Sequence, residues 1–151
     1  MDRIKEGIIT VDGIELSPNT TLEDLEKIEI DKGVQRDHPQ GFFELVFNHP
    51  IHSDGVDFQV SVRYLKKTGQ MIILLDPKNS PGIHGGLKES REDQELSEGW
   101  LKRNMGIEPT VDTDDGIFYS FPWGHVHSAA AEHVNFGYLK GGIIITYGDE
   151  M

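Results

Sequence analysis

Cysteine is absent from this sequence of 151 residues. Its absence excludes disulfide bonds, thiolate nucleophiles and zinc or iron–sulfur sites held by cysteine. Long hydrophobic runs are absent too, since the longest, at residues 71–75, is far shorter than the roughly 20 residues of a membrane-spanning helix. The opening residues MDRIKEGIITVDG are charged and precede no apolar stretch of the kind found in signal peptides. We therefore expect a soluble cytoplasmic protein without a membrane partner.

Positive charge is scarce, because 14 Lys and Arg residues face 26 Asp and Glu residues and the formal net charge is -12. Proteins that bind nucleic acid or anionic lipid rely on clustered Lys and Arg, so the acidic balance argues against both partners. With 36% hydrophobic and 26% charged residues, the composition is typical of a folded protein rather than a disordered acidic tail. The length predicts a single domain over residues 1–151.

The acidic residues are distributed unevenly along the chain. Residues 1–40 and 84–115 each carry a net charge of -5, residues 41–83 are neutral, and residues 116–151 carry -2. One interpretation is a solvated face that keeps the protein soluble. The other is an acidic surface that recognises a basic partner, because complementary charge speeds association and fixes orientation.

The first half of the chain predicts a hairpin, a short helix and a meander of strands. Asp12-Gly13, between the apolar residues 8–11 and 14–16, is typical of a type I′ hairpin turn. Thr20-Thr21-Leu22-Glu23 has the spacing of a capping box and indicates a helix over residues 20–28. Apolar residues alternate at 43–47 and at 58–64, which predicts strands, and the wholly apolar residues 71–75 predict a central strand.

The second half repeats this order with a longer helix. A cap at Ser90 and Asp93, and Gly106 as the residue after the last turn, predict a helix over residues 90–105. Beyond Pro109, a hairpin is expected at residues 110–121, with further strands at Val126 and residues 143–145. Strands grouped in meanders predict the α+β class, with an antiparallel sheet, two helices and a helix-then-meander arrangement that occurs twice.

Histidines gather in the last third of the chain. On one strand, His125 and His127 would point to the same face, and His133 could complete a three-ligand metal site with a position left for water. The alternative is structural: Tyr119, Phe121, Trp123, His125 and His127 share parity and would form one half-buried aromatic face, which Pro122 would put at a sheet edge or a bulge. No His-Glu-x-x-His motif accompanies them.

Other chemical motifs fail on spacing. The acidic stretch at residues 112–116 resembles a calcium loop, but its Gly is fifth and Trp123 stands where the bidentate Glu belongs. No Gly-x-Ser-x-Gly elbow is present, and the Gly-rich residues 82–86 lack the Lys-Ser/Thr of a phosphate-binding loop. No cofactor is therefore expected, and an enzymatic function is not indicated.

The compact segment WLKRNMGIEPTVDTDDGIFYSFPWG joins a helix that ends in Gly, a Pro-Thr turn and an aromatic strand that ends in Trp-Gly. With the size, the acidity and the lack of cysteine, this chain resembles the small acidic immunity-type proteins that accompany bacterial polymorphic toxins. The resemblance covers about a sixth of the chain and transfers no functional residue. It implies a binding role, in which acidic residues occlude a basic toxin.

Our hypothesis is a non-enzymatic immunity or inhibitor protein that neutralises a basic partner toxin. The acids assigned to partner binding are those of the second helix and the following turn: Glu89, Glu92, Asp93, Glu95, Asp112, Asp114 and Asp115. The alternative is a metal-dependent enzyme or metal-binding protein that uses His125, His127 and His133. A third possibility is a structural subunit whose sheet edges make an oligomer, and the sequence leaves the oligomeric state open.

Overall fold

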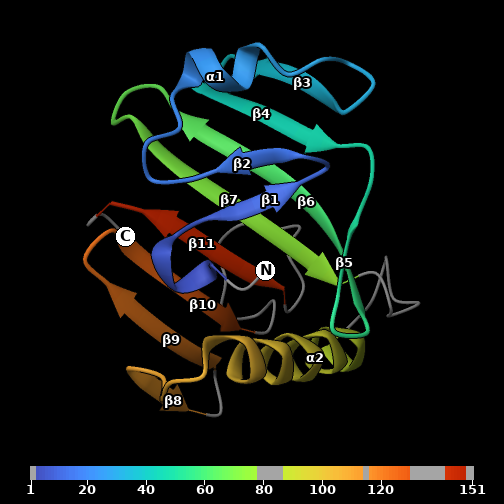
Figure 1. Cartoon of the computed structure of the whole chain (residues 1–151), viewed down its shortest axis with the longest axis vertical. Helices are drawn as coiled ribbons and strands as arrows, with labels where there is room; N and C mark the ends of the chain where they lie inside the picture. The colour runs from blue at the N-terminus through green and yellow to red at the C-terminus, as the bar shows by residue number, and fades with distance from the viewer. Residues whose placement is uncertain (1–2, 78–86, 114–115, 130–141, 149–151) are drawn as a thin grey trace.

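A nine-stranded antiparallel sheet, a separate two-stranded hairpin and two α-helices make up the described part of the chain (Figure 1). The computed structural model describes residues 3–77, 87–113, 116–129 and 142–148, with the backbone alone at residues 87–93 and 129. This arrangement confirms the expected α+β class with an antiparallel sheet.

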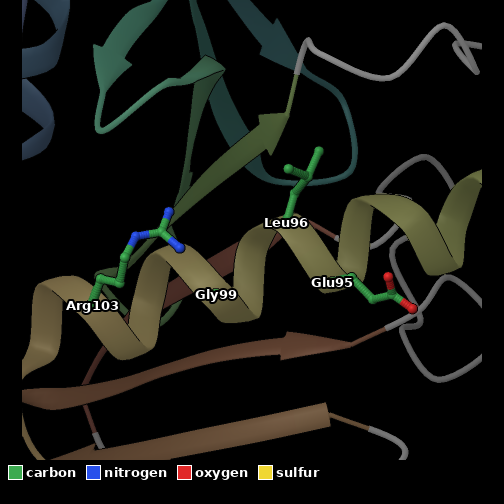
Figure 2. A pocket seen from close by; sticks show the side chains of 4 residues that line it. All are labelled: Glu95, Leu96, Gly99 and Arg103. Carbon is green, nitrogen blue, oxygen red and sulfur yellow. The ribbon is translucent and has the colours of Figure 1, made fainter.

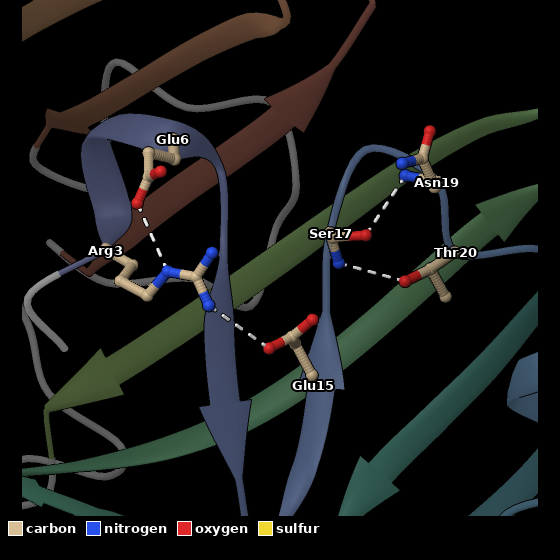
Figure 3. A network of polar contacts seen from close by, with 6 residues as sticks. All are labelled: Arg3, Glu6, Glu15, Ser17, Asn19 and Thr20. Carbon is tan, nitrogen blue, oxygen red and sulfur yellow. Dashed lines mark hydrogen bonds and ion pairs between the residues drawn. The ribbon is translucent and has the colours of Figure 1, made fainter.

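The chain opens with a 3-10 turn, η1 (Ile4–Glu6), and the hairpin of β1 (Ile9–Val11) and β2 (Ile14–Leu16). Asp12 and Gly13 both have positive φ, as the predicted type I′ turn requires. Arg3 ties this region together, with Nε 3.2 Å from a carboxylate oxygen of Glu6 and Nη1 3.5 Å from one of Glu15 (Figure 3).

A turn leads from the hairpin into α1 (Leu22–Glu26). The backbone N–H of Ser17 donates to Thr20 Oγ1 at 2.9 Å, and that of Asn19 donates to Ser17 Oγ at 3.1 Å (Figure 3). The capping box forms one residue later than predicted, because Thr21 and Asp24 exchange the two hydrogen bonds. These bonds hold the pKa of Asp24 below its usual value.

Two meanders follow, each preceded by a helix. The first contains β3 (Gly33–His38), β4 (Phe42–Phe47), β5 (Ile51–Ser53), β6 (Val56–Leu65) and β7 (Gln70–Pro77). After α2 (Leu87–Met105), the second contains β8 (Val111–Thr113), β9 (Gly116–Phe121), β10 (Gly124–Ala129) and β11 (Ile143–Tyr147). The repeated helix-then-meander order is thus confirmed. Helix α2 begins three residues earlier than predicted, and β3 and β5 had no counterpart in the prediction.

The two meanders join into one sheet through their last strands. The strand order is β3-β4-β6-β7-β11-β10-β9-β8, with Ile73 of β7 opposite Ile145 of β11. The ninth strand, β5, lies off this path and pairs with β6. The last strand of the first meander, β7, pairs antiparallel with the last strand of the second, β11. An approximate two-fold axis normal to the sheet therefore relates the two meanders. Strands β3 and β8 therefore occupy equivalent positions at the two edges, each directly after the loop that follows its helix.

One face of the sheet carries the main hydrophobic core. Inward residues of six strands form it together with residues of η1, the β1–β2 hairpin, α1 and α2: Ile4, Leu16, Leu25, Leu45, Phe58, Val62, Ile73, Trp100, Tyr119, Val126 and Ile145. The opposite face has a smaller buried cluster of Ile72, Leu74 and Ile144 on the two central strands. Burial on both faces explains the uninterrupted apolar sequence at these positions.

Candidate functional site

The end of α2 is anchored to the sheet by aromatic packing. Trp100 is fully buried, stands edge-on to Phe58 at 5.2 Å between ring centres, and donates from Nε1 to Ser53 Oγ at 3.1 Å. The helix ends at Met105, and Gly106 follows in the left-handed conformation, as the sequence predicted. The chain then passes Pro109 and enters the edge strand β8.

We call the surface formed by Lys102, Ile107, Glu108, Val111 and Asp112 the α2–β8 corner. Ile107 and Val111 are 47% and 49% exposed, which makes them two of the few large apolar side chains that the described residues leave in solvent. Ile107 lines a hollow of about 490 Å³ together with Lys102, Gly106, Glu108 and Pro109. The corner thus combines exposed apolar groups, a shallow depression and a sheet edge.

Negative charge lies on the α2 side of this edge, where Ile107 is. Val111 points to the opposite face of the sheet, because it pairs with Phe118, whereas Asp112 pairs with the core residue Ile117. Lys102 Nζ lies 3.2 Å from Asp112 Oδ2 in an ion pair, and both side chains are half-exposed. Glu108 is exposed and makes no ion pair with any residue that the structure describes. Burial raises the pKa of Tyr119, and the negative charges of Asp112 and Glu108 raise it further. The corner is therefore an acidic environment with one lysine in it.

A second hollow, of about 430 Å³, lies along α2 and is lined by Glu95, Leu96, Gly99 and Arg103 (Figure 2). Gly99 has no side chain and so leaves room between Glu95, one helical turn before it, and Arg103, one turn after it. Arg103 is held by an ion pair with Asp54 in the loop between β5 and β6. This hollow is a surface feature of the helix and shows no arrangement of reactive groups.

The structure places some of the predicted binding acids. Glu95 is exposed on α2 and Asp112 is exposed on β8. Glu89, Glu92 and Asp93 belong to α2, but their side chains lie outside the described residues, as do Asp114 and Asp115 altogether. Sequence reasoning missed Ile107 and Val111, because exposure of a single apolar residue in a loop or a short strand leaves no periodic pattern.

The predicted aromatic stripe is wrong. A turn at Pro122 and Trp123 separates β9 from β10, so Tyr119 faces the main core opposite Val126, while His125 and His127 face the other side of the sheet. The parity argument assumed one continuous strand, and the turn reverses the chain direction in the middle of the proposed stripe.

The two histidines form a cluster with Phe118 in which His125 is buried and the other two side chains are partly buried. The ring centres of the two histidines are 6.0 Å apart, and Phe118 stacks on His125 at 4.9 Å. His125 is 5% exposed, and burial lowers its pKa. Burial, with a smaller contribution from His125, lowers the pKa of His127 from 6.5 to about 4. Both rings are therefore neutral at pH 7.

His127 Nδ1 is buried and has no hydrogen-bond partner among the described residues. His133, the expected third ligand, lies outside the described part of the chain, where the prediction stays open. Within that part, no group of three His, Asp or Glu side chains is arranged to hold a metal ion. The pair alone supplies two nitrogen donors on one face.

Comparisons of the chain with protein-family models, with curated proteins and with solved structures find no match. Among the described residues, no helix is both long and apolar enough to span a bilayer.

Proposed function

We propose that this protein is a non-enzymatic, cytoplasmic binding protein of the immunity or inhibitor type, which holds a basic partner protein at the α2–β8 corner. The observation that carries the proposal is the exposure of Ile107, which lines a hollow with Lys102 and Glu108 next to the ion pair of Lys102 with Asp112. Val111 is exposed on the opposite face of the same edge strand. The resemblance to immunity proteins of toxin systems supplies the partner class, a basic toxin.

The composition of the corner is typical of a protein-binding surface rather than of a charged surface that only keeps the protein soluble. Protein interfaces place apolar side chains at their centre and charged groups at a rim that stays near water. Here the exposed Ile107 lines a hollow that a partner side chain could fill. The surrounding carboxylates would attract a basic partner and fix its orientation, which raises the association rate more than the affinity.

The test is purification from the host at low salt, followed by affinity measurement with the co-purifying protein. We expect a basic protein whose affinity falls with added salt. The double variant Glu108→Lys/Asp112→Lys should weaken binding at least tenfold, and Ile107→Asp should weaken it by a similar factor. Glu15→Lys, at an exposed acid on β2, is the matched control and should bind normally. Equal binding by all variants would refute the assignment of the corner.

A metal-binding function is the second candidate, and one observation favours it. His125 and His127 share a face, and the buried Nδ1 of His127 has no partner among the described residues, so a nitrogen donor is available there. Untagged protein should then contain a stoichiometric transition metal, and His127→Ala should lose it. Protein purified with only trace zinc, manganese, iron and nickel would exclude this candidate.

A further inference from the structure

The edge strand at the other end of the sheet, β3, carries backbone groups that are free to pair. The backbone N–H of Asn48 donates to Lys32 O at 2.9 Å, so the pair Lys32–Asn48 is a hydrogen-bonded one. Pairs along an antiparallel ladder alternate between bonded and non-bonded. Gln35 and Asp37 fall on the non-bonded positions opposite Leu45 and Phe43, and they direct their N–H and C=O groups away from β4.

No described residue hydrogen-bonds these outward backbone groups. Strand β3 has β4 as its single neighbour in the described sheet, and its residues from Val34 to Asp37 are exposed. Unpaired edges of this kind are templates for the addition of another strand, and proteins commonly guard them with a bulge, a proline or a covering segment.

Apolar side chains gather at this edge. Val34 and Val46 stand directly opposite each other on the face away from the main core and are both exposed. Ile30, in the loop before β3, is 81% exposed, and its carbonyl oxygen accepts a hydrogen bond of 2.9 Å from Asn48 Nδ2. These three residues are the remaining large apolar side chains that the described residues leave exposed, besides the two at the α2–β8 corner.

Acidic residues flank the same edge on the side of α1. The side-chain amide of Gln35 donates to the carbonyl oxygens of Glu26 and Ile28 at 3.2 and 2.8 Å, which places the end of α1 against β3. Glu26, Glu29 and Asp31 are exposed and make no ion pair with any described residue.

The lysines nearest to these acids in sequence are engaged elsewhere. Lys27 pairs with Glu23 at 3.3 Å, and Lys32 Nζ donates to the carbonyl oxygen of Asp12 at 3.0 Å. Glu26, Glu29 and Asp31 are therefore left without compensation by Lys27 and Lys32 on the α1 side of the edge. Two cations lie at β3 itself: Arg36 is exposed on the other face of the strand, and Lys66 pairs with Asp37.

We propose that the β3 edge is a second docking surface, which takes an extended basic segment of a partner protein as an additional strand of the sheet. Successive side chains of a strand point to opposite faces. An alternating segment would therefore present basic residues to the acids at the end of α1 and apolar residues to Val34 and Val46.

Charge selects this occupant over a second copy of the chain. Two copies paired through β3 would bring two sets of the acids Glu26, Glu29 and Asp31 together, in molecules that each carry a net charge of -12. A basic segment would instead be attracted to these acids, whereas two acidic copies would repel each other.

The approximate two-fold axis places the β3 edge in a position equivalent to that of β8 at the α2–β8 corner. Each edge strand follows a loop with an exposed isoleucine, Ile30 or Ile107, and each carries an exposed valine, Val34 or Val111. The inference goes beyond the proposed function, because it concerns the opposite edge of the sheet and stands or fails with residues that the corner does not contain.

The test uses the full chain and a short synthetic peptide in which lysine and valine alternate, with an alternating glutamate–valine peptide as the control. Backbone amide exchange is measured at each residue of β3 with and without peptide. Strand addition should slow exchange at Gln35 and Asp37 while leaving Val34 and Arg36, whose N–H groups already face β4, unchanged. Protection without this alternation, or no protection at saturating lysine–valine peptide, would overturn the proposal.

Variants separate the two surfaces. The triple variant Glu26→Lys/Glu29→Lys/Asp31→Lys should weaken binding of the lysine–valine peptide about tenfold or more and favour the glutamate–valine peptide. Glu108→Lys/Asp112→Lys should leave β3 protection unchanged, so a failure at one surface is distinct from a failure at the other. A wild-type dimer with alternating protection in β3 in the absence of peptide would assign the edge to self-association and would contradict the proposal.

Discussion

The hydroxyl group of Tyr147 donates a buried hydrogen bond of 2.7 Å to the carbonyl oxygen of Gly7. Trp123 Nε1 donates to the carbonyl oxygen of Lys5 at 2.9 Å, so two aromatic residues of the second meander hold the N-terminal turn. Gly7 has a φ of 77°, and a Cβ atom there would lie 2.8 Å from the Trp123 ring. The η1 turn is thus fixed by contacts with the β9–β10 turn and β11.

Tyr147→Phe should lower the free energy of unfolding by about 1 to 2 kcal/mol, because the buried carbonyl group of Gly7 loses its partner. Tyr119→Phe is the matched control, since the Tyr119 hydroxyl is buried and has no hydrogen-bond partner among the described residues. Removing that hydroxyl should leave stability unchanged or raise it. Urea denaturation of both variants measures the difference, and equal losses would contradict the role given to the Tyr147 bond.

Gly99→Ala should raise the free energy of unfolding by about 0.5 to 1 kcal/mol, because alanine loses less backbone entropy than glycine inside a helix. Gly99 lies within α2 and lines the hollow shown in Figure 2. A Cβ atom there would lie 3.2 Å from Arg103 Nη1, the far end of a long side chain. Thermal and urea unfolding measure the gain.

Gly124→Ala is the opposing control for this substitution. Its Cβ atom would lie 2.0 Å from the backbone oxygen of Thr146, so it should destabilise the protein strongly. A loss of stability in Gly99→Ala would show that Arg103 cannot move aside without losing its ion pair to Asp54.

Local chemistry made much of this fold predictable. Asp12-Gly13 specified its hairpin, Gly106 ended α2, and alternation placed β4 and β6, because each signal depends on neighbouring residues alone. Strand β3 could not be found in this way. Its residues between Gly33 and His38 are mostly exposed and polar, and pairing with β4 rather than its own pattern makes it a strand.

The candidate site was less accessible to sequence reasoning. The charge distribution pointed to α2 and Asp112, but not to the exposed Ile107 and Val111 that give the corner its apolar part. The pairing of β7 with β11, which makes β3 and β8 the two edges, joins residues far apart in sequence and has no local signal.

Removing the ion pair between Lys102 and Asp112 should change stability little. Both side chains are about half-exposed, and pairs of this kind contribute about 0.2 to 1 kcal/mol in double-mutant cycles. Lys102→Ala, Asp112→Ala and the double variant, measured by urea denaturation, should give a coupling energy in that range that falls with added salt. A coupling of several kcal/mol would mean that Asp112 is structural, and that charge reversal there reports on folding rather than on partner binding.

Acid should destabilise the protein through His127. Burial lowers the pKa of this side chain from 6.5 to about 4, so between these pH values the unfolded chain binds a proton that the folded chain does not. Stability is therefore unaffected by this group above about pH 6.5, falls as the pH drops toward 4, and loses about 3 kcal/mol in total. His127→Gln should flatten this part of the stability profile, while His49→Gln, at an exposed histidine, controls for the loss of one histidine. Titration of the His127 ring by NMR gives the midpoint directly, and a midpoint near 6.5 would show that the ring reaches solvent and would remove the predicted acid sensitivity.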